Sequence, residues 1–180
     1  TSAGISLLNI STSESRLLYS NITEDFFQVP SLYYDDQLKR LWIGTGSAGL
    51  FYYDIIRKSL SDIPIRNFPK QPILAIRKDA KNTLLIGIDG QGIWNISEKG
   101  DTILHIYKED LNNPFSLRGD GVYDILCDGS KNWIATFTGK LSFFENNNSQ
   151  ITPVTYQINN PNSLGNNYVN QIIEDHEGHI

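Results

Sequence analysis

The chain has 180 residues, a formal net charge of -5, a hydrophobic fraction of 39% and one cysteine. Its lysines and arginines are scattered, which excludes the basic stripe that nucleic-acid binding needs and argues against an anionic membrane surface as partner. One cysteine cannot form an internal disulfide, and no segment is long and apolar enough to predict a membrane span. The composition fits one globular domain or a short repeat array.

A hairpin pattern recurs along the chain. The stretch Leu41–Asp54, "LWIGTGSAGLFYYD", has two apolar runs around a glycine-rich turn, which predicts strand, turn and strand. The pattern returns without a gap at Leu84–Ser97 and at Asn132–Glu145, and Ser2–Asn9 matches its second half, Ser47–Asp54. A period of about 45 residues is typical of repeat architectures such as propellers.

A strand that ends in aspartate precedes each hairpin. These strands are expected at Pro30–Asp36, Ile73–Asp79, Val122–Asp128 and Val169–Asp175. The final aspartates are interpreted as residues whose side chains cap a turn. The turns that follow have no repeated oxygen ligands, so they do not predict calcium loops.

Another strand is expected after each hairpin, at Arg16–Tyr19, Ile63–Asn67, Thr102–Tyr107 and Thr152–Gln157. The connectors Asn112–Asp128 and Asn159–Asp175 share an Asn-Asn-Pro-x-Ser-Leu pattern, in which proline keeps the preceding residue extended. Four short strands in each unit of about 45 residues match the spacing of a propeller blade.

The predicted fold is therefore all-β: a β-propeller fragment of about four blades of four antiparallel strands, three complete and one split between the termini. A single domain spans 1–180, with partial blades at 1–28 and 168–180 and blades at 29–70, 71–120 and 121–167. Apolar columns of the repeat predict a core between neighbouring blades, formed by Leu41, Ile43, Leu50, Ile76, Leu84, Ile86, Ile93, Ile125, Ile134, Leu141 and Ile172.

The motifs together resemble the two-component regulator propeller repeat. They are the aspartate-ended strand, the "LWIGT" run at Leu41–Thr45, the "GLFYYD" run at Gly49–Asp54 and the Asn-Pro-x-Ser-Leu connector. The resemblance covers nearly the whole chain and is weaker at Trp133–Leu141, where the glycine pattern changes. It implies the extracytoplasmic sensor region of a hybrid two-component system histidine kinase, from bacteria that forage on polysaccharides.

The resemblance also implies that this chain is a piece of a longer protein, whose membrane helix and kinase lie outside it. We accordingly expect a periplasmic segment that senses an oligosaccharide, regulates polysaccharide-utilisation genes, and has neither catalytic activity nor a cofactor of its own. Two alternatives stay open. A propeller lyase or glycosidase would show two carboxylates about 5–10 Å apart, and a protein-binding scaffold would show an apolar face without a polar cleft.

In a propeller, the turn inside each hairpin and the connector between units emerge on one face, around the mouth of the central channel. Polar and aromatic residues of these loops are the predicted ligand-binding residues: Asp89, Gln91, Trp94, Arg118, Asp120, Phe137 and Asn167. The alternative is that these are ordinary solvated turns. Trp42 and Trp133 share a repeat column with Leu85, so we expect both indoles in the core.

The remaining reactive side chains predict no chemistry. His176 and His179 have no third ligand in view, so no metal site is expected. Cys127 has no histidine nearby and is expected to be an inert thiol.

The last expectation concerns association. An open arc of blades would expose apolar faces and unpaired strand edges, which invite pairing with another chain. We expect a homodimer in which the Tyr168–Asp175 strand of one chain meets the Ile5–Ile10 region of the other and closes a pseudo-ring.

Overall fold

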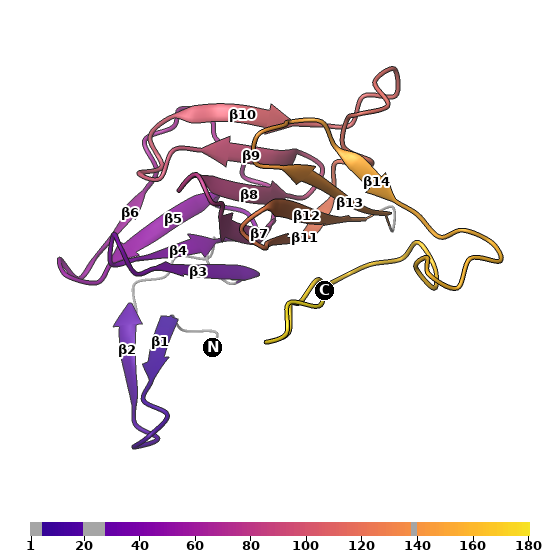
Figure 1. The fold of residues 1–180 in the computed structure, drawn as a ribbon. Coiled ribbons are helices and arrows are strands. Elements are labelled where there is room, and N and C mark those ends of the chain that lie inside the picture. Colours follow the sequence, from indigo (N-terminus) through magenta and orange to yellow (C-terminus); the bar gives the residue numbers. More distant parts are fainter. Residues whose placement is uncertain (1–4, 20–27, 138–139) are drawn as a thin grey trace.

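The computed structural model describes residues 5–19, 28–137 and 140–180 (Figure 1). These residues form antiparallel strands and no helix, so none of them belongs to a helix that could cross a membrane. The strands are β1 (Ile5–Leu8), β2 (Ser15–Tyr19), β3 (Ser31–Asp35), β4 (Arg40–Gly44), β5 (Leu50–Asp54), β6 (Ser59–Asp62), β7 (Ile73–Lys78), β8 (Leu84–Ile88), β9 (Gly92–Ile96), β10 (Ile103–Tyr107), β11 (Val122–Cys127), β12 (Lys131–Thr136), β13 (Lys140–Glu145) and β14 (Thr152–Val154).

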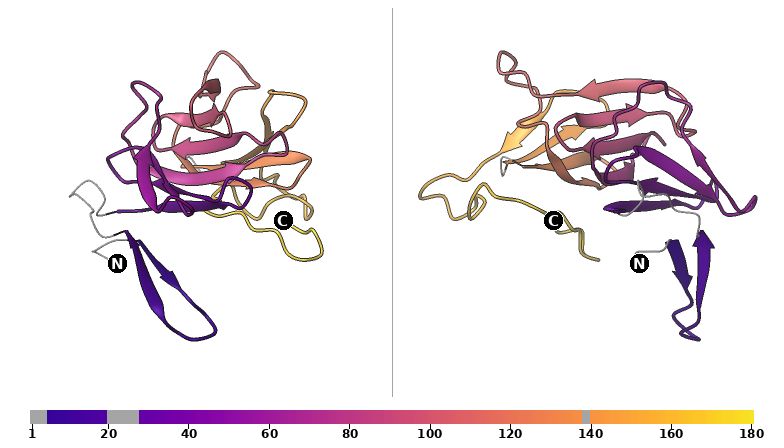
Figure 2. Two further views of the ribbon diagram at one scale, coloured as in Figure 1. Left: turned by 90° about the vertical axis from the view of Figure 1, so that its left-hand side faces the viewer. Right: turned by 180° about the vertical axis from the view of Figure 1, so that it is seen from behind.

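The described strands form three four-stranded sheets and one two-stranded sheet. Each large sheet is a meander in chain order: β3-β4-β5-β6, β7-β8-β9-β10 and β11-β12-β13-β14. Their first strands lie together, with β7 in contact with both β3 and β11, and the sheets fan outward from there (Figures 1 and 2). The β1–β2 hairpin is the smaller sheet. The all-β, propeller-like fold is confirmed; residues 1–4 and 20–27 of the first predicted partial blade lie outside the described residues.

The outer strand of the first large sheet differs from the sequence prediction. It is β6 at Ser59–Asp62, and the prediction of Ile63–Asn67 was wrong. Asp54 accepts the backbone N–H groups of Ile56 and Arg57 at 3.0 and 2.8 Å, which closes a short turn and starts β6 opposite Asp54. Pro64, directly after this strand and Ile63, has no N–H to continue a ladder.

The predicted strand at Val169–Asp175 was also wrong, because this segment pairs with no strand among the described residues. The backbone N–H of Ile172 instead donates to Asp124 Oδ2 at 3.0 Å. The Ile172 side chain is buried with Ala135 and Leu141. A segment without a ladder partner is thus held by the Ile172 hydrogen bond, the buried Ile172 side chain and the partly buried Val169. Its turn still forms at Asp175.

The predicted core is confirmed. All of its members are buried apart from Leu41, which is half-buried beside the β1–β2 hairpin. The residues lie between successive sheets: Ile76 and Ile86 pack with Trp42 and Leu50, and in the next interface Ile125 and Ile134 pack with Ala75, Leu85 and Ile93. Trp42 is fully buried as expected, whereas Trp133 is half-buried and donates its indole N–H to Asp128 at 2.8 Å.

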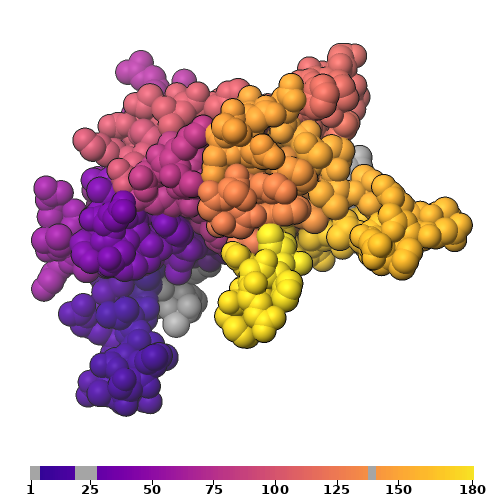
Figure 3. Space-filling view, in the orientation of Figure 1, coloured from indigo at the N-terminus to yellow at the C-terminus, as the bar shows by residue number. Residues whose placement is uncertain are grey.

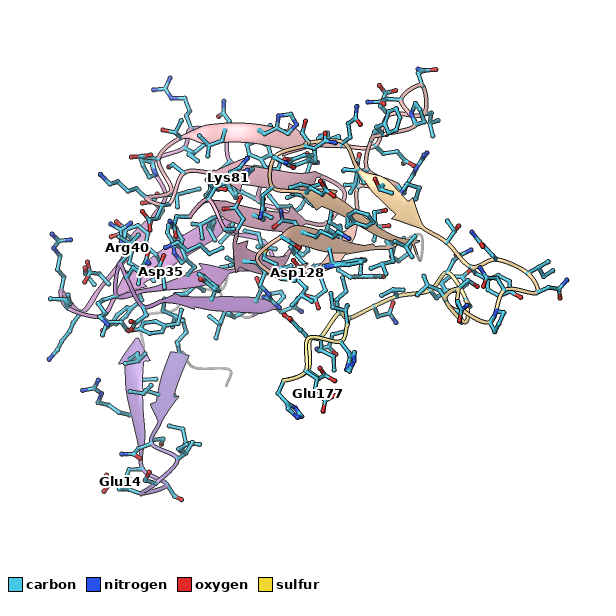
Figure 4. All side chains as sticks on the ribbon, viewed as in Figure 1. Glu14, Asp35, Arg40, Lys81, Asp128 and Glu177 are labelled. Atoms are coloured by element: carbon cyan, nitrogen blue, oxygen red, sulfur yellow. The ribbon has the colours of Figure 1, made fainter. Side chains whose placement is uncertain are left out.

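Aspartates cap the turn after each first strand, with one correction of register. Asp35, and not Asp36, holds the first turn by accepting the N–H groups of Gln37 and Leu38 at 3.0 and 3.1 Å (Asp35 is labelled in Figure 4). Asp79, Asp128 and Asp175 each accept two backbone N–H groups in the same way. Asp36 is exposed and pairs with Lys39 at 2.6 Å. The first turn has one residue fewer than the second, which shifts the capping position.

A buried ionic contact joins the first two large sheets. Lys78 of β7 places Nζ 3.0 Å from Asp35 Oδ2 and 2.6 Å from Glu98 Oε1. Burial alone would lower the pKa of Lys78, but its bonds to Glu98 and Asp35 outweigh that effect and raise it. Because the Asp35 and Lys78 side chains are almost fully buried, removing either partner would leave an uncompensated charge between the sheets.

Truncation of Ile125 tests the packing of the sheets. Ile125→Ala should lower the free energy of unfolding by roughly 2–5 kcal/mol, because the side chain is fully buried and the cavity would be walled by neighbouring sheets. Ile56→Ala, in an exposed turn, is the matched control and should change it by less than about 0.5 kcal/mol. If chemical denaturation shows that both variants lose the same unfolding free energy, the assigned core is wrong.

Acid unfolding tests the aspartate turns. Burial opposes the charged form of Asp128, but donors from Lys131, Trp133 and Ser130 hold its pKa at about 2. A carboxyl whose folded pKa is depressed stabilises the fold above its unfolded value of about 3.9, and that stability is lost as pH falls toward the folded value.

Asp128→Asn should therefore cost roughly 1–3 kcal/mol of unfolding free energy at neutral pH, since a charged acceptor becomes neutral. The difference in unfolding free energy between the variant and the parent chain should disappear between about pH 4 and pH 2, because both chains then carry an uncharged side chain at position 128. Asp62→Asn, at an exposed position, is the control. If denaturation series show a difference in unfolding free energy that does not change with pH, the ionised Asp128 carboxylate does not stabilise this turn.

Candidate functional site

A polar cavity of about 440 Å³ lies where the first strands of the three large sheets meet the C-terminal segment. Antiparallel meanders leave one edge of each first strand without a ladder partner, so side chains and backbone groups of these strands are free to face the cavity. The described lining consists of Pro30, Ser31, Leu32, Leu74, Arg77, Tyr123, Asp124, Asn170 and Gln171.

An ion pair between neighbouring sheets forms the charged part of the cavity. Arg77 of β7 places Nη2 3.2 Å from Asp124 Oδ1 of β11. Nη1 of Arg77 donates to the carbonyl of Ile76 at 2.9 Å, and Asp124 also accepts the backbone N–H of Ile172. Asp124 is buried and Arg77 is half-buried, so the carboxylate is fixed and the guanidinium keeps N–H groups facing solvent.

A pair of aromatic side chains adjoins the cavity. Tyr123, which lines the cavity, meets Phe137 edge to face, with ring centroids 5.6 Å apart. Phe137 is 65% exposed, and its backbone N–H donates to the carbonyl of Gly121 at 2.6 Å. A methyl group on Gly121 would lie 2.9 Å from Phe137 Cβ and 3.3 Å from Asp89 Oδ1. Glycine at position 121 thus leaves room for Phe137 and for the carboxylate of Asp89, two of the predicted site residues.

The predicted loop residues Gln91, Arg118, Asp120 and Asn167 make contacts that order the loops. Gln91 Oε1 accepts from Lys108 Nζ at 3.2 Å, and Arg118 Nη2 donates to the carbonyl of Pro114 at 2.6 Å. Asp120 Oδ1 accepts the N–H of Glu109, and Asn167 Oδ1 accepts the N–H of Tyr156, each at 2.7 Å. None of these contacts places the four side chains beside Asp89 and Phe137, and ligand binding through them stays a prediction.

Trp94, the remaining predicted site residue, packs between sheets. Its ring meets Phe68 edge to face at 5.2 Å, within the cluster that contains Trp42 and Ile86. Its buried indole N–H has no hydrogen-bond partner among the described residues. The neighbouring sheet, and not the mouth of the cavity, therefore determines the orientation of Trp94.

Sequence reasoning missed the side chains of the first strands. Arg77, Tyr123 and Asp124 lie on strands, whereas the predicted site residues come from the loops and from the hairpin strand with Trp94. One signal in the sequence points to them: two charged residues, Arg77 and Asp124, and the aromatic Tyr123 stand within strands that are otherwise mostly apolar. Nothing in the sequence indicated that Arg77 and Asp124 are in contact, because they belong to different repeats.

Two other places in the fold carry side chains capable of chemistry. Asp175, Glu177 and His179 place one ligand atom each within 4.8 Å of the others, but all three are exposed and Asp175 Oδ1 already accepts two backbone N–H groups of its turn. Burial, reinforced by the charge of Asp79, raises the pKa of the Cys127 thiol to about 12, which leaves it protonated at neutral pH.

A second, apolar hollow of about 630 Å³ lies between the β1–β2 hairpin and the first large sheet. Its described lining is Leu7, Arg16, Leu17, Leu18, Tyr34, Leu41, Tyr53, Ile55 and Lys58. The hairpin and the C-terminal residues project on the same side of the molecule (Figure 3). Leu32, paired with Ile43 as Ile76 is with Ile86, is 47% exposed, whereas Ile76 is fully buried. The first large sheet thus leaves part of one face uncovered.

No family model and no curated protein matches the sequence. Solved structures match the fold. The extracellular domain of the B. thetaiotaomicron hybrid two component system BT4673 aligns over 99% of this chain and 30% of its own length, with 16% identity and a TM-score of 0.60. A second BT4673 structure, described as a one component system, gives 20% identity, a TM-score of 0.64 and coverage of 87% and 20%.

The extracellular domain of the hybrid two component system BT3049, from the same organism, aligns over 98% of this chain and 27% of its own length, with 18% identity and a TM-score of 0.51. The predicted resemblance therefore leads to the same kind of protein as the comparison of structures. At these identities the likeness is one of fold, and this chain spans less than a third of the length of each of the three.

Proposed function

We propose that this chain is a ligand-sensing propeller segment of a bacterial membrane sensor histidine kinase of the hybrid two-component type, and that its ligand is an oligosaccharide. The observation that carries the proposal is the polar cavity lined by Arg77, Asp124 and Tyr123, with the exposed ring of Phe137 in contact with Tyr123. The fold that holds this cavity is shared with extracellular domains of two-component systems.

The chemistry of the cavity suits a sugar. Arg77 supplies hydrogen-bond donors, Asp124 supplies an acceptor, and the amides of Asn170 and Gln171 supply both. The exposed ring of Phe137 offers a flat apolar surface to the C–H face of a pyranose, and Tyr123, in edge-to-face contact with it, lines the cavity. Few polar groups around an apolar or aromatic surface are the usual composition of a small-molecule site.

Binding accounts for the cavity better than hydrolysis does. Asp124 is the one carboxylate among the described residues that line it, and Arg77 and the N–H of Ile172 already engage it. A glycosidase uses two carboxyl groups on either side of the scissile bond. The polar lining likewise favours a sugar over the purely protein-binding scaffold, for which an apolar face is expected.

Signalling would follow from a change of population. A ligand shifts two arrangements of a sensor only if it binds one of them better. Asn170 and Gln171 come from the C-terminal segment and line the cavity, so a bound sugar would contact this segment together with the sheets. On this proposal the whole chain, residues 1–180, lies in the periplasm and is divided into the predicted blades. The sensor to which it belongs regulates genes for polysaccharide use.

Replacement of Tyr123 tests ligand binding. In a glycan array followed by calorimetry, Tyr123→Ala should weaken binding of the selected glycan by about tenfold or more, equivalent to about 1.4 kcal/mol. Tyr156→Ala, an exposed tyrosine outside the cavity lining, is the matched control and should bind like the parent chain. Equal affinity of the two variants would remove the cavity from consideration.

We also infer self-association through the uncovered face of the first sheet. β1 corresponds in the repeat to β5, β9 and β13, each of which is paired on both edges. Among the described strands, β1 is paired on one edge only, with β2. Leu7, Leu17 and Tyr34, each about half exposed, surround the adjoining apolar hollow. The unpaired Tyr168–Asp175 segment of a second copy, meeting Ile5–Ile10, would supply both a ladder and a cover.

Light scattering at tens of micromolar tests this association. The parent chain should be a dimer, and Leu7→Lys should be a monomer, because an ammonium group would be buried in the apolar hollow. Leu111→Lys, at a position that is 90% exposed and outside the hollow, should remain a dimer. A monomeric parent chain would refute the dimer.

A further inference from the structure

The charges around the cavity cancel. Arg77 and Asp124 are the two charged residues of its described lining, and they contact each other at 3.2 Å. The other described lining residues are apolar, or carry a hydroxyl or an amide. A ligand that enters therefore meets one positive and one negative group side by side, without an excess of either.

The negative partner cannot be turned away from the cavity at low cost. Asp124 is buried, its Oδ1 accepts the N–H of Ile125 at 2.9 Å, and its Oδ2 accepts the N–H of Ile172 at 3.0 Å. Rotation of the carboxylate would leave these buried donors without a partner. Arg77 is more exposed and is anchored by the carbonyl of Ile76. An incoming anion could thus approach Arg77 only by also facing the Asp124 carboxylate.

The fixed carboxylate decides against charged ligands. A carboxylate or sulfate on the ligand would be repelled by Asp124 wherever it approaches Arg77, because the two side chains are in contact, while a hydroxyl group would not be repelled.

Hydroxyl groups match what the pair offers. A hydroxyl both donates and accepts, so adjacent hydroxyls of a sugar can donate to Asp124 and accept from Arg77. We propose that the cavity selects neutral oligosaccharides and discriminates against those that carry uronic acid or sulfate groups. This inference rests on the proposed function, since it names the class of sugar that the same cavity takes.

Matched sugars test the selection. The probes are pairs that differ in oxidation at C6, cellobiose with cellobiouronic acid and α-1,4-galactobiose with digalacturonic acid, together with an array of neutral, uronate and sulfated glycans. The neutral members should bind the parent chain at least tenfold more tightly than their charged partners. Equal or tighter binding of charged glycans would overturn the inference and leave oligosaccharide sensing standing. Binding of no glycan would overturn the proposed function and this inference with it.

A change of charge at Asp124 gives a second test. Asp124→Asn should improve the ratio of uronate to neutral binding by at least tenfold, because Arg77 then faces the ligand without its counter-charge. Glu145→Gln removes the same charge from an exposed position outside the cavity and should leave the ratio unchanged. An unchanged ratio in Asp124→Asn would refute charge selection.

If Asp124→Asn does not fold, as judged by circular dichroism, Arg77→Gln replaces it. This variant leaves the cavity with an excess negative charge, so the ratio should shift further toward neutral sugars. A shift toward uronates would contradict the proposal.

Discussion

Each sheet of this protein depends on its neighbours to cover an apolar face. A four-stranded antiparallel meander with isoleucine and leucine on both faces is stable only when other layers exclude water from those faces. Ile86 and Ile134 are fully buried because the sheets pack in series. The same requirement explains Leu32, which occupies the register of buried isoleucines but remains half exposed where the cover is incomplete. Both the fold and the cavity between the first strands follow from this serial packing.

Polar contacts between the sheets specify how they are arranged. Lys78 links Asp35 to Glu98 in the first interface, and Arg77 contacts Asp124 in the second. Paired charges inside such interfaces contribute little net stability, because desolvation offsets their attraction. We infer that they specify which strands lie next to each other. At Arg77 and Asp124 the same contact is left partly open to solvent, which makes a structural ion pair available to a ligand.

The candidate site combines fixed and adjustable parts. Arg77, Tyr123 and Asp124 are held on first strands that are covered by neighbouring sheets, so the geometry they present is rigid. Asn170 and Gln171 belong to a segment without strand pairing, attached through Ile172. A ligand that touches both parts can alter the position of one against the other. The proposed sensing function needs such a division, because a ligand shifts two arrangements only if it binds one of them better.

The sequence by itself determined the repeat, and through it the strands, the buried columns and the capping aspartates, because apolar alternation and turn chemistry are local properties of each unit. It placed the outer strand of the first sheet incorrectly and assigned the first cap to Asp36 in place of Asp35, since one residue of turn length changes the register. Tertiary structure decided that Trp94 packs against Phe68, that Val169–Asp175 remains unpaired, and that Arg77 meets Asp124. The Trp94–Phe68 and Arg77–Asp124 contacts join different repeats, and only the packing of one sheet on the next brings these residues together.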